Sequence, residues 1–236
     1  MTQGTELLNS TGVISGAGTF TQAGTGTTVL NKANTYTGAT TLSAGTLIAA
    51  NAAALGTSAA GTTIASGATL DVQANIGTEA ISVAGNGVGG HGALVTGTGT
   101  GTVGGAVTLT ADARVGGAGS LTIAGDIGGA FKVTKVGAGT TTLSGVQNYT
   151  TLATNEGVTN VSGAFTGGTA TVNANATTNF AVSQTLLALN IGTVALAELS
   201  PSFGTGAGVV PEPGAAISLL GGIGMLLGLH RSRRRR

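Results

Sequence analysis

The chain has 236 residues, of which 44 are glycine, 7% are charged and none is cysteine or tryptophan. Five of its nine basic residues lie after position 230, which leaves four basic against eight acidic residues, a net charge of −4, over the rest. This balance excludes an electrostatic basis for nucleic-acid binding, and the absence of cysteine excludes a disulfide framework. The threonine and aliphatic content favours strands, and glycine-weakened strands need to stack on similar neighbours.

The N-terminus does not read as an export signal. Residues 1–8 contain no basic stretch, no apolar stretch and no small-residue cleavage site. We therefore expect that the chain is an N-terminally truncated piece of a longer exported protein. The alternative is a protein that stays in the cytoplasm.

An internal repeat follows. Residues 14–41 match residues 127–154 at a constant offset of 113, with 12 identities in 28 positions. The first copy contains Gly24-Thr25-Gly26-Thr27-Thr28-Val29-Leu30 and then Asn34-Thr35-Tyr36-Thr37-Gly38 through Gly45-Thr46-Leu47. The second contains Gly137-Ala138-Gly139-Thr140-Thr141-Thr142-Leu143 and Asn148-Tyr149-Thr150.

These residues resemble the autotransporter-associated β-strand repeat, and the resemblance covers about residues 14–51 and 127–163. It implies a passenger-type β-solenoid built for surface display. The second copy departs from the pattern, with Thr151 in place of Gly38 and Gly157-Val158-Thr159 in place of Gly45-Thr46-Leu47. The register of its last strand is therefore open.

Alternation of apolar and polar residues predicts the same architecture without the family. Within residues 63–72, Ile64, Ala68, Leu70 and Val72 share one face, whereas Thr63, Thr69 and Asp71 share a face expected to be wet. Val107 with Leu109, and Leu121 with Ile123, repeat the scheme. We predict an all-β, right-handed parallel β-helix over residues 1–199, with roughly ten rungs of about 20 residues each. Residues 184–199 are expected to form a last strand pair or a short capping helix.

Chemistry-bearing residues are sparse, so no catalytic, cofactor or metal site is predicted. His91 lies between glycines and is expected to be an exposed loop residue, and Asp71, Asp112 and Asp126 are expected to be turn residues. If two of these acids shared a groove, they would support a carbohydrate-active enzyme, a polysaccharide lyase or hydrolase, on the β-helix scaffold. Alternating threonines at positions 96, 98, 100 and 102 resemble the threonine faces of ice-binding solenoids, although the sequence shows no stacked partner for this run.

The C-terminus combines three signals in order. Residues 200–209 read as a flexible linker, Val210-Pro211-Glu212-Pro213 follows, and residues 214–229 are an uncharged apolar run. The run is followed by a cluster of arginines: Arg231, Arg233, Arg234, Arg235 and Arg236. As a helix the 16 apolar residues reach about 24 Å, which is short for a membrane span, and the arginines would remain on the cytoplasmic side.

This order resembles the PEP-CTERM sorting signal of Gram-negative bacteria over residues 210–236. The resemblance implies that residues 210–213 are recognised by an exosortase, that the helix is a transient inner-membrane anchor, and that the arginines orient it. We therefore expect an exported structural or adhesin-like protein of the cell surface or of an exopolysaccharide matrix. The alternatives are the carbohydrate-active enzyme and a cryptic fragment of a longer autotransporter-like protein with no independent function.

Overall fold

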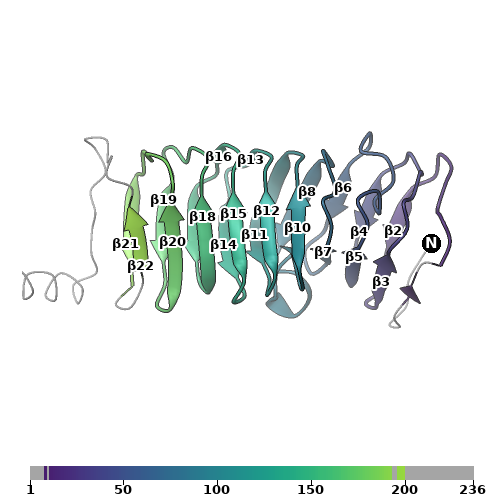
Figure 1. Cartoon of the computed structure of the whole chain (residues 1–236), viewed down its shortest axis with the longest axis horizontal. Coiled ribbons are helices and arrows are strands. Elements are labelled where there is room, and N and C mark those ends of the chain that lie inside the picture. The colour runs from purple at the N-terminus through teal and green to yellow at the C-terminus, as the bar shows by residue number, and fades with distance from the viewer. Residues whose placement is uncertain (1–7, 10, 193–195, 200–236) are drawn as a thin grey trace, which may run out of the picture.

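A computed structural model describes residues 8–9, 11–192 and 196–199, which form a coil of short strands stacked along one axis (Figure 1). Its first half contains β1 (Leu8–Asn9), β2 (Phe20–Gln22), β3 (Thr27–Leu30), β4 (Thr40–Leu42), β5 (Thr46–Ala49), β6 (Thr62–Ile64), β7 (Thr69–Val72), β8 (Ile81–Gly85), the 3₁₀ turn η1 (Val88–Gly90), β9 (Leu94–Val95), β10 (Thr100–Val103) and β11 (Val107–Gly116). Its second half contains β12 (Ser120–Ile123), β13 (Ile127–Gly128), β14 (Lys132–Val136), β15 (Thr140–Leu143), β16 (Gln147–Asn148), β17 (Thr151–Thr154), β18 (Gly157–Val161), β19 (Thr169–Val172), β20 (Ala176–Phe180), β21 (Ala188–Ile191) and β22 (Leu196–Leu199).

Every strand pair in this part of the chain is parallel and joins neighbouring rungs, which confirms the predicted all-β parallel solenoid. Three faces result. Face A is β1-β3-β5-β7-β9-β11-β14-β17-β19-β21, face B is β10-β12-β15-β18-β20-β22, and face C is β2-β4-β6-β8-β11-β13-β16. β11 serves two faces: its start pairs with β8 and β13, and its end pairs with β9 and β14. A register shift between Leu109 and Ala113 separates the two halves.

The predicted rung length is confirmed by the register. Thr100 pairs with Ser120, and Ser120 pairs with Thr140, so one turn takes 20 residues there, the same interval that separates Asp112 from its backbone partner Lys132. The ten strands of face A are joined by nine steps, so the described coil has about nine turns, against the predicted ten. The last two described strands are β21, which pairs with β19 on face A, and β22, which pairs with β20 on face B. The right hand of the coil stays a prediction.

The predicted linker at residues 200–209 and the predicted transmembrane helix at 214–229 lie outside the described residues. Within the described part, no helix combines the length and the apolar character that a membrane crossing requires.

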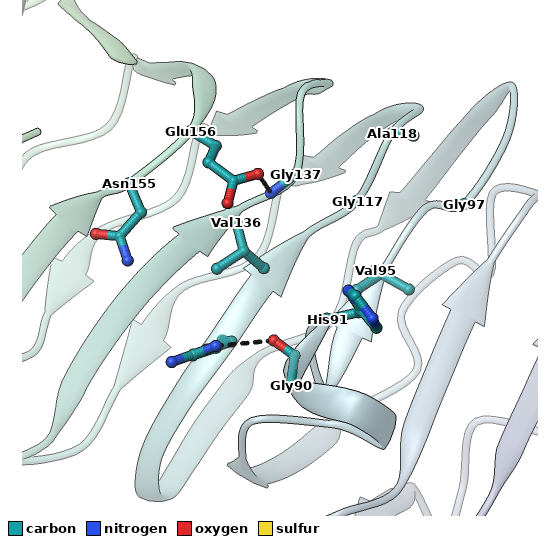
Figure 2. A pocket seen from close by; sticks show the side chains of 11 residues that line it. Gly90, His91, Val95, Gly97, Gly117, Ala118, Val136, Gly137, Asn155 and Glu156 are labelled. Atoms are coloured by element: carbon teal, nitrogen blue, oxygen red, sulfur yellow. Dashed lines mark hydrogen bonds between the residues drawn. The ribbon is translucent and has the colours of Figure 1, made fainter. Parts of the chain in front are cut away.

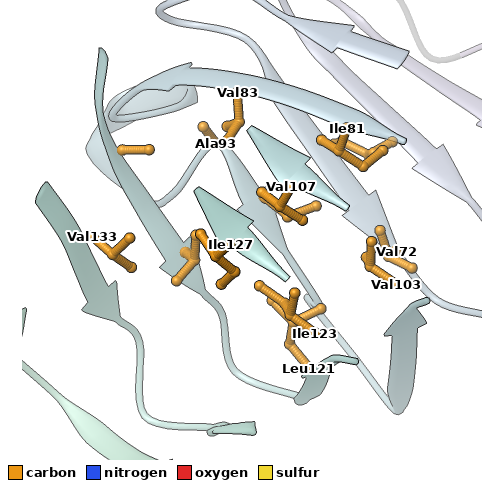
Figure 3. Close-up of a cluster of buried hydrophobic side chains, with 14 of the residues drawn as sticks. Val72, Ile81, Val83, Ala93, Val103, Val107, Leu121, Ile123, Ile127 and Val133 are labelled. Carbon is orange, nitrogen blue, oxygen red and sulfur yellow. The ribbon is translucent and has the colours of Figure 1, made fainter. Parts of the chain in front are cut away.

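The core is a set of inward columns in which each side chain rests on its counterpart one rung away. Ile64, Ala68, Leu70 and Val72 are at most 1% exposed, as the alternation predicts. Val107, Leu109, Leu121 and Ile123 are buried as well, and Figure 3 shows several of these side chains meeting between the sheets. Burying each large aliphatic side chain contributes about 1.5–3 kcal/mol, so the columns supply the stability that a single rung lacks.

The expected wet face of residues 63–72 is wrong at two positions. Thr69 is 7% exposed and Asp71 is 8% exposed, because backbone at Val88, Gly92 and Gly97, on either side of the neighbouring strand β9, binds their side chains. Thr69 Oγ1 donates to Gly92 O at 2.8 Å and accepts from Val88 N at 2.9 Å. Asp71 accepts from Gly97 N at 2.8 Å and from Gln73 Nε2 at 2.9 Å. The segment that binds them belongs to a long turn, since Leu70 pairs with Leu94 rather than with position 90.

The two repeat copies build the same corner with different residues. In the first, fully buried Gln22 donates through Nε2 to Gly24 O and Gly26 O, both at 3.1 Å. In the second, Lys135 occupies the equivalent position and donates through Nζ to Gly137 O and to Gly139 O, the latter at 2.6 Å. A buried side chain that donates to the two corner carbonyls is therefore a shared feature of both copies.

Because the second copy has Lys135 where the first has Gln22, one of its buried hydroxyls lacks a hydrogen-bond partner among the described residues. Thr28 Oγ1 donates to Gln22 Oε1 at 2.6 Å. Its counterpart Thr141 is equally buried, but lysine has no acceptor, and Thr141 Oγ1 has no hydrogen-bond partner among the described residues. The second copy therefore carries both a buried ammonium and an unsatisfied hydroxyl.

The open register of the second copy is resolved by two glycines. Gly45 and Gly157 both have positive φ, 69° and 62°, and a Cβ at either would lie within 2.5 Å of a carbonyl oxygen in the rung below. The offset of 113 aligns Tyr36 with Tyr149. Gly45 and Gly157 are one position closer together than this offset, so the second copy is one residue shorter between Tyr149 and Gly157. As a result Thr159 and Val161, rather than Asn160, face inward as Leu47 and Ala49 do.

We predict that Lys135→Gln stabilises the protein by about 1 kcal/mol, which for a chain of this size raises the melting temperature by about 3 °C. Glutamine keeps donors for Gly137 O and Gly139 O and gives Thr141 an acceptor. The measurement is thermal or urea unfolding followed by circular dichroism. The reciprocal change Gln22→Lys is the matched control and should destabilise the protein by orphaning Thr28; a Lys135→Gln protein less stable than the wild type would contradict the assignment.

The difference in stability between the wild type and Lys135→Gln should depend on pH. Burial lowers the pKa of the Lys135 ammonium from 10.5 to about 8, with Glu156 opposing the shift. Between pH 8 and 10.5 the unfolded chain then binds more protons at this site than the folded chain, so the wild type gains stability as pH rises. The stability advantage of Lys135→Gln should shrink between pH 7.5 and 9.5, measured as the difference in unfolding free energy. A constant difference would mean that Lys135 keeps an ordinary pKa.

Candidate functional site

The predicted sorting residues cannot be placed in the fold. Val210, Pro211, Glu212 and Pro213, together with Arg231 and Arg233 to Arg236, lie outside the described residues. The candidate site described below lies on the solenoid body.

A surface groove of about 370 Å³ lies beside the loop that follows β8 (Figure 2). The loop is Gly-rich and contains η1 and His91, and it forms one wall. The opposite side is formed by rungs stacked on face A and their corners. The lining residues are Gly90, His91, Val95, Gly97, Arg114, Gly117, Ala118, Val136, Gly137, Asn155 and Glu156. The groove exists because the turn between β8 and β11 is longer than its neighbours: Ile81 pairs with Val107, whereas Val107 pairs with Ile127 in the next turn.

The charged groups of the groove hold backbone in place. Arg114 Nη1 donates to Gly90 O at 2.9 Å and so ties the loop to β11. Glu156 Oε2 accepts from Gly137 N at 3.1 Å in the next rung (Figure 2). His91 is exposed on the loop, as the sequence predicts. The groove was missed by sequence reasoning, and the length of the glycine-rich stretch at 85–92 was its only signal.

The acids singled out from the sequence act as clamps between rungs. Asp112 accepts from Lys132 N at 2.9 Å, and Asp126 accepts from Val146 N at 2.8 Å, in each case 20 residues along the chain. Asp71 is held by Gly97 N and Gln73 as described above. Each carboxylate thus binds a backbone or side-chain N–H, which accounts for these acids structurally. Within residues that the structure describes, no three His, Asp or Glu side chains form a metal-binding cluster.

Two buried polar groups escaped the sequence analysis. Glu79 is 3% exposed and accepts from Thr62 Oγ1 at 2.7 Å; burial raises the pKa of its carboxyl, and the bond from Thr62 opposes this. Tyr36 donates to or accepts from Thr40 Oγ1 at 2.6 Å, and burial raises its pKa to about 12. Both groups lie inside the coil near the N-terminal rungs, so they contribute to packing rather than to a surface site.

Comparison with known families gives a match in the N-terminal rungs. The family model described as "Passenger-associated-transport-repeat" matches residues 20–49, which span β2 to β5 and include the Gln22 corner. The chain carries a passenger-type repeat. This finding fits the resemblance of the first copy to an autotransporter-associated repeat. Comparison with curated proteins and with solved structures gave no match.

The passenger-type repeat lies within the regular part of the solenoid, away from the groove. Its match covers two rungs in which inward Thr28, Leu30, Leu42, Leu47 and Ala49 are buried. The repeat therefore describes how the rod is built. A β-solenoid that carries such a repeat suggests an exported, cell-surface passenger domain of a Gram-negative bacterium with a structural role.

Proposed function

We propose that this chain is an exported structural or adhesin-like rod that an exosortase sorts to the cell surface or into an exopolysaccharide matrix. The observation that carries the exported role is the β-solenoid with a passenger-type repeat at residues 20–49. A rod made of rungs that contact only their neighbours holds its two ends apart, which is the property that a surface spacer needs.

The sorting step of the proposal rests on the C-terminal sequence. Val210-Pro211-Glu212-Pro213 would be the segment that the exosortase recognises, and the apolar residues 214–229 would hold the chain transiently in the inner membrane. The five arginines Arg231, Arg233, Arg234, Arg235 and Arg236 would keep the end of the chain in the cytoplasm. The solenoid would then lie on the far side of that membrane, where the matrix is assembled.

The test is processing in a Gram-negative host that has an exosortase, with a secretory leader placed before Met1 so that export does not depend on the start of the chain. We predict that the wild type appears as a shortened form outside the inner membrane. Pro211→Ala combined with Pro213→Ala should leave the uncut form in the inner membrane, as judged by fractionation and mass spectrometry.

Pro201→Ala is the matched control, because Pro201 is the remaining proline of the chain and lies in the predicted linker. It should be processed like the wild type. Unchanged processing of the Pro211 and Pro213 variant would reject the sorting role, whereas equal loss in the Pro201 variant would point to a general effect of proline removal.

A further inference from the structure

The outward side of face B carries two columns of small side chains, all of them polar except Val158. They run over five rungs, from β10 through β12, β15 and β18 to β20. The first column is Thr100, Ser120, Thr140, Val158 and Thr177, and the second is Thr102, Thr122, Thr142, Asn160 and Asn179. The strand pairs place each residue directly over the next, so the Thr-x-Thr or Ser-x-Thr motif recurs in three consecutive rungs.

The sequence showed only an isolated run of alternating threonines, and the structure supplies its stacked partners. It also corrects the membership of the run. Thr96 faces inward, is fully buried and donates to Val72 O at 2.9 Å, so it does not belong to the surface. Thr100 and Thr102 do belong to it, and their partners are contributed by β12 and β15, one and two rungs further along the chain.

The hydroxyls of this surface are available for hydrogen bonds with a ligand, whereas that of buried Thr154 is already paired. Inward-facing Thr154 bonds to both Thr159 and Thr178, at 2.9 and 2.7 Å. Thr100, Thr102, Ser120, Thr122, Thr140, Thr142 and Thr177 are exposed or half-buried, and within the described residues their hydroxyls make no hydrogen bond. Each hydroxyl therefore retains one donor and two acceptor sites for a ligand.

The spacing of the hydroxyls is fixed in two directions. Neighbouring rungs are about 4.8 Å apart, and side chains two residues apart on a strand are about 6.6 Å apart. Threonine is β-branched and stiff at χ1, so its hydroxyl and methyl groups keep their orientation without a ligand. Face B thus presents a preorganised two-dimensional array, and preorganisation reduces the entropy lost on binding.

The chemical character of the column residues limits the class of ligand that face B can bind. No column residue from β10 to β20 is charged, which gives no basis for attracting an ionic ligand. None is aromatic, so the columns offer no platform on which a sugar ring could stack. The ligand class that fits is therefore a neutral one that forms hydrogen bonds at regular spacings in two directions. Ice belongs to this class, because its prism face presents water oxygens in rows of comparable spacing.

We propose that face B binds ice through the hydroxyl and methyl groups of these two columns. Each contact is weak, but a rigid ligand engages many of them at once, so the contacts act as one multivalent surface. This activity is separate from the proposed sorting and surface role: it depends on β10, β12 and β15, and not on the C-terminal segment.

The test measures how much of the full chain enters slowly growing ice, with buffer alone and an unrelated protein as blanks. We predict that the wild type is enriched in ice and inhibits ice recrystallisation. Thr122→Tyr combined with Thr142→Tyr should reduce both readouts to the blank level, because two large rings in the middle of the columns break their regular array.

The matched control is Thr63→Tyr combined with Thr108→Tyr, which places the same side chains at exposed positions of face C. It should behave like the wild type, and all three proteins should share one melting temperature and circular dichroism spectrum. Wild type that is excluded from ice like the unrelated protein overturns the proposal, as does a control that loses as much activity as the face B variant.

A parallel sedimentation with insoluble cellulose and chitin identifies the competing ligand class. If the wild type is excluded from ice but sediments with either polysaccharide, and Thr122→Tyr with Thr142→Tyr abolishes this, face B is a carbohydrate surface and the ice proposal is wrong. None of these outcomes depends on exosortase processing, so they separate this proposal from the proposed function.

Discussion

Stacking of one rung on the next is the constraint on which this molecule depends. A single rung of about 20 residues has one or two large apolar side chains per strand and many glycines, which is too little buried surface to offset the entropy of ordering it. In the coil, each strand gains parallel hydrogen bonds on both sides, and each inward side chain gains a neighbour above and below. Polar side chains also link neighbouring rungs, because Asp112, Asp126 and Glu156 each accept a hydrogen bond from a backbone N–H of an adjacent rung.

Much of this fold could be predicted from the sequence because its signals are local. Alternation identified Ile64, Leu70 and Val72 as core residues, and the rung of about 20 residues expected for a β-helix agrees with the observed register. The failures involve contacts between distant segments. Asp71 was expected in water because nothing near it in sequence shows that Gly97, 26 residues further on, binds its carboxylate, and the groove beside His91 also depends on contacts between distant segments. The unsatisfied Thr141 is invisible without the corner geometry that brings Lys135 to it. The sorting residues stay a prediction.

The feature that the two repeat copies share is a corner of the coil rather than one of its faces. In the first copy the Gln22 corner joins β2 of face C to β3 of face A, whereas in the second the Lys135 corner joins β14 of face A to β15 of face B. The sequence offset between the copies is not a whole number of turns, so the second copy falls on the next edge of the coil. The same motif therefore serves two of the three edges of this coil, so the faces between its corners can differ while the corners stay alike. Face B, with its threonine columns, is one such diverged surface.

Because each rung contacts only its neighbours, the coil is expected to respond to a pulling force one rung at a time. A force that pulls on the last rung loads only the contacts between that rung and its neighbour, both hydrogen bonds and apolar packing, so the rungs detach one after another rather than together. Extension would then proceed as a series of small detachments, each releasing the slack of a single turn, and the remaining turns would stay folded. A rod of this kind would therefore yield gradually under tension, one turn at a time.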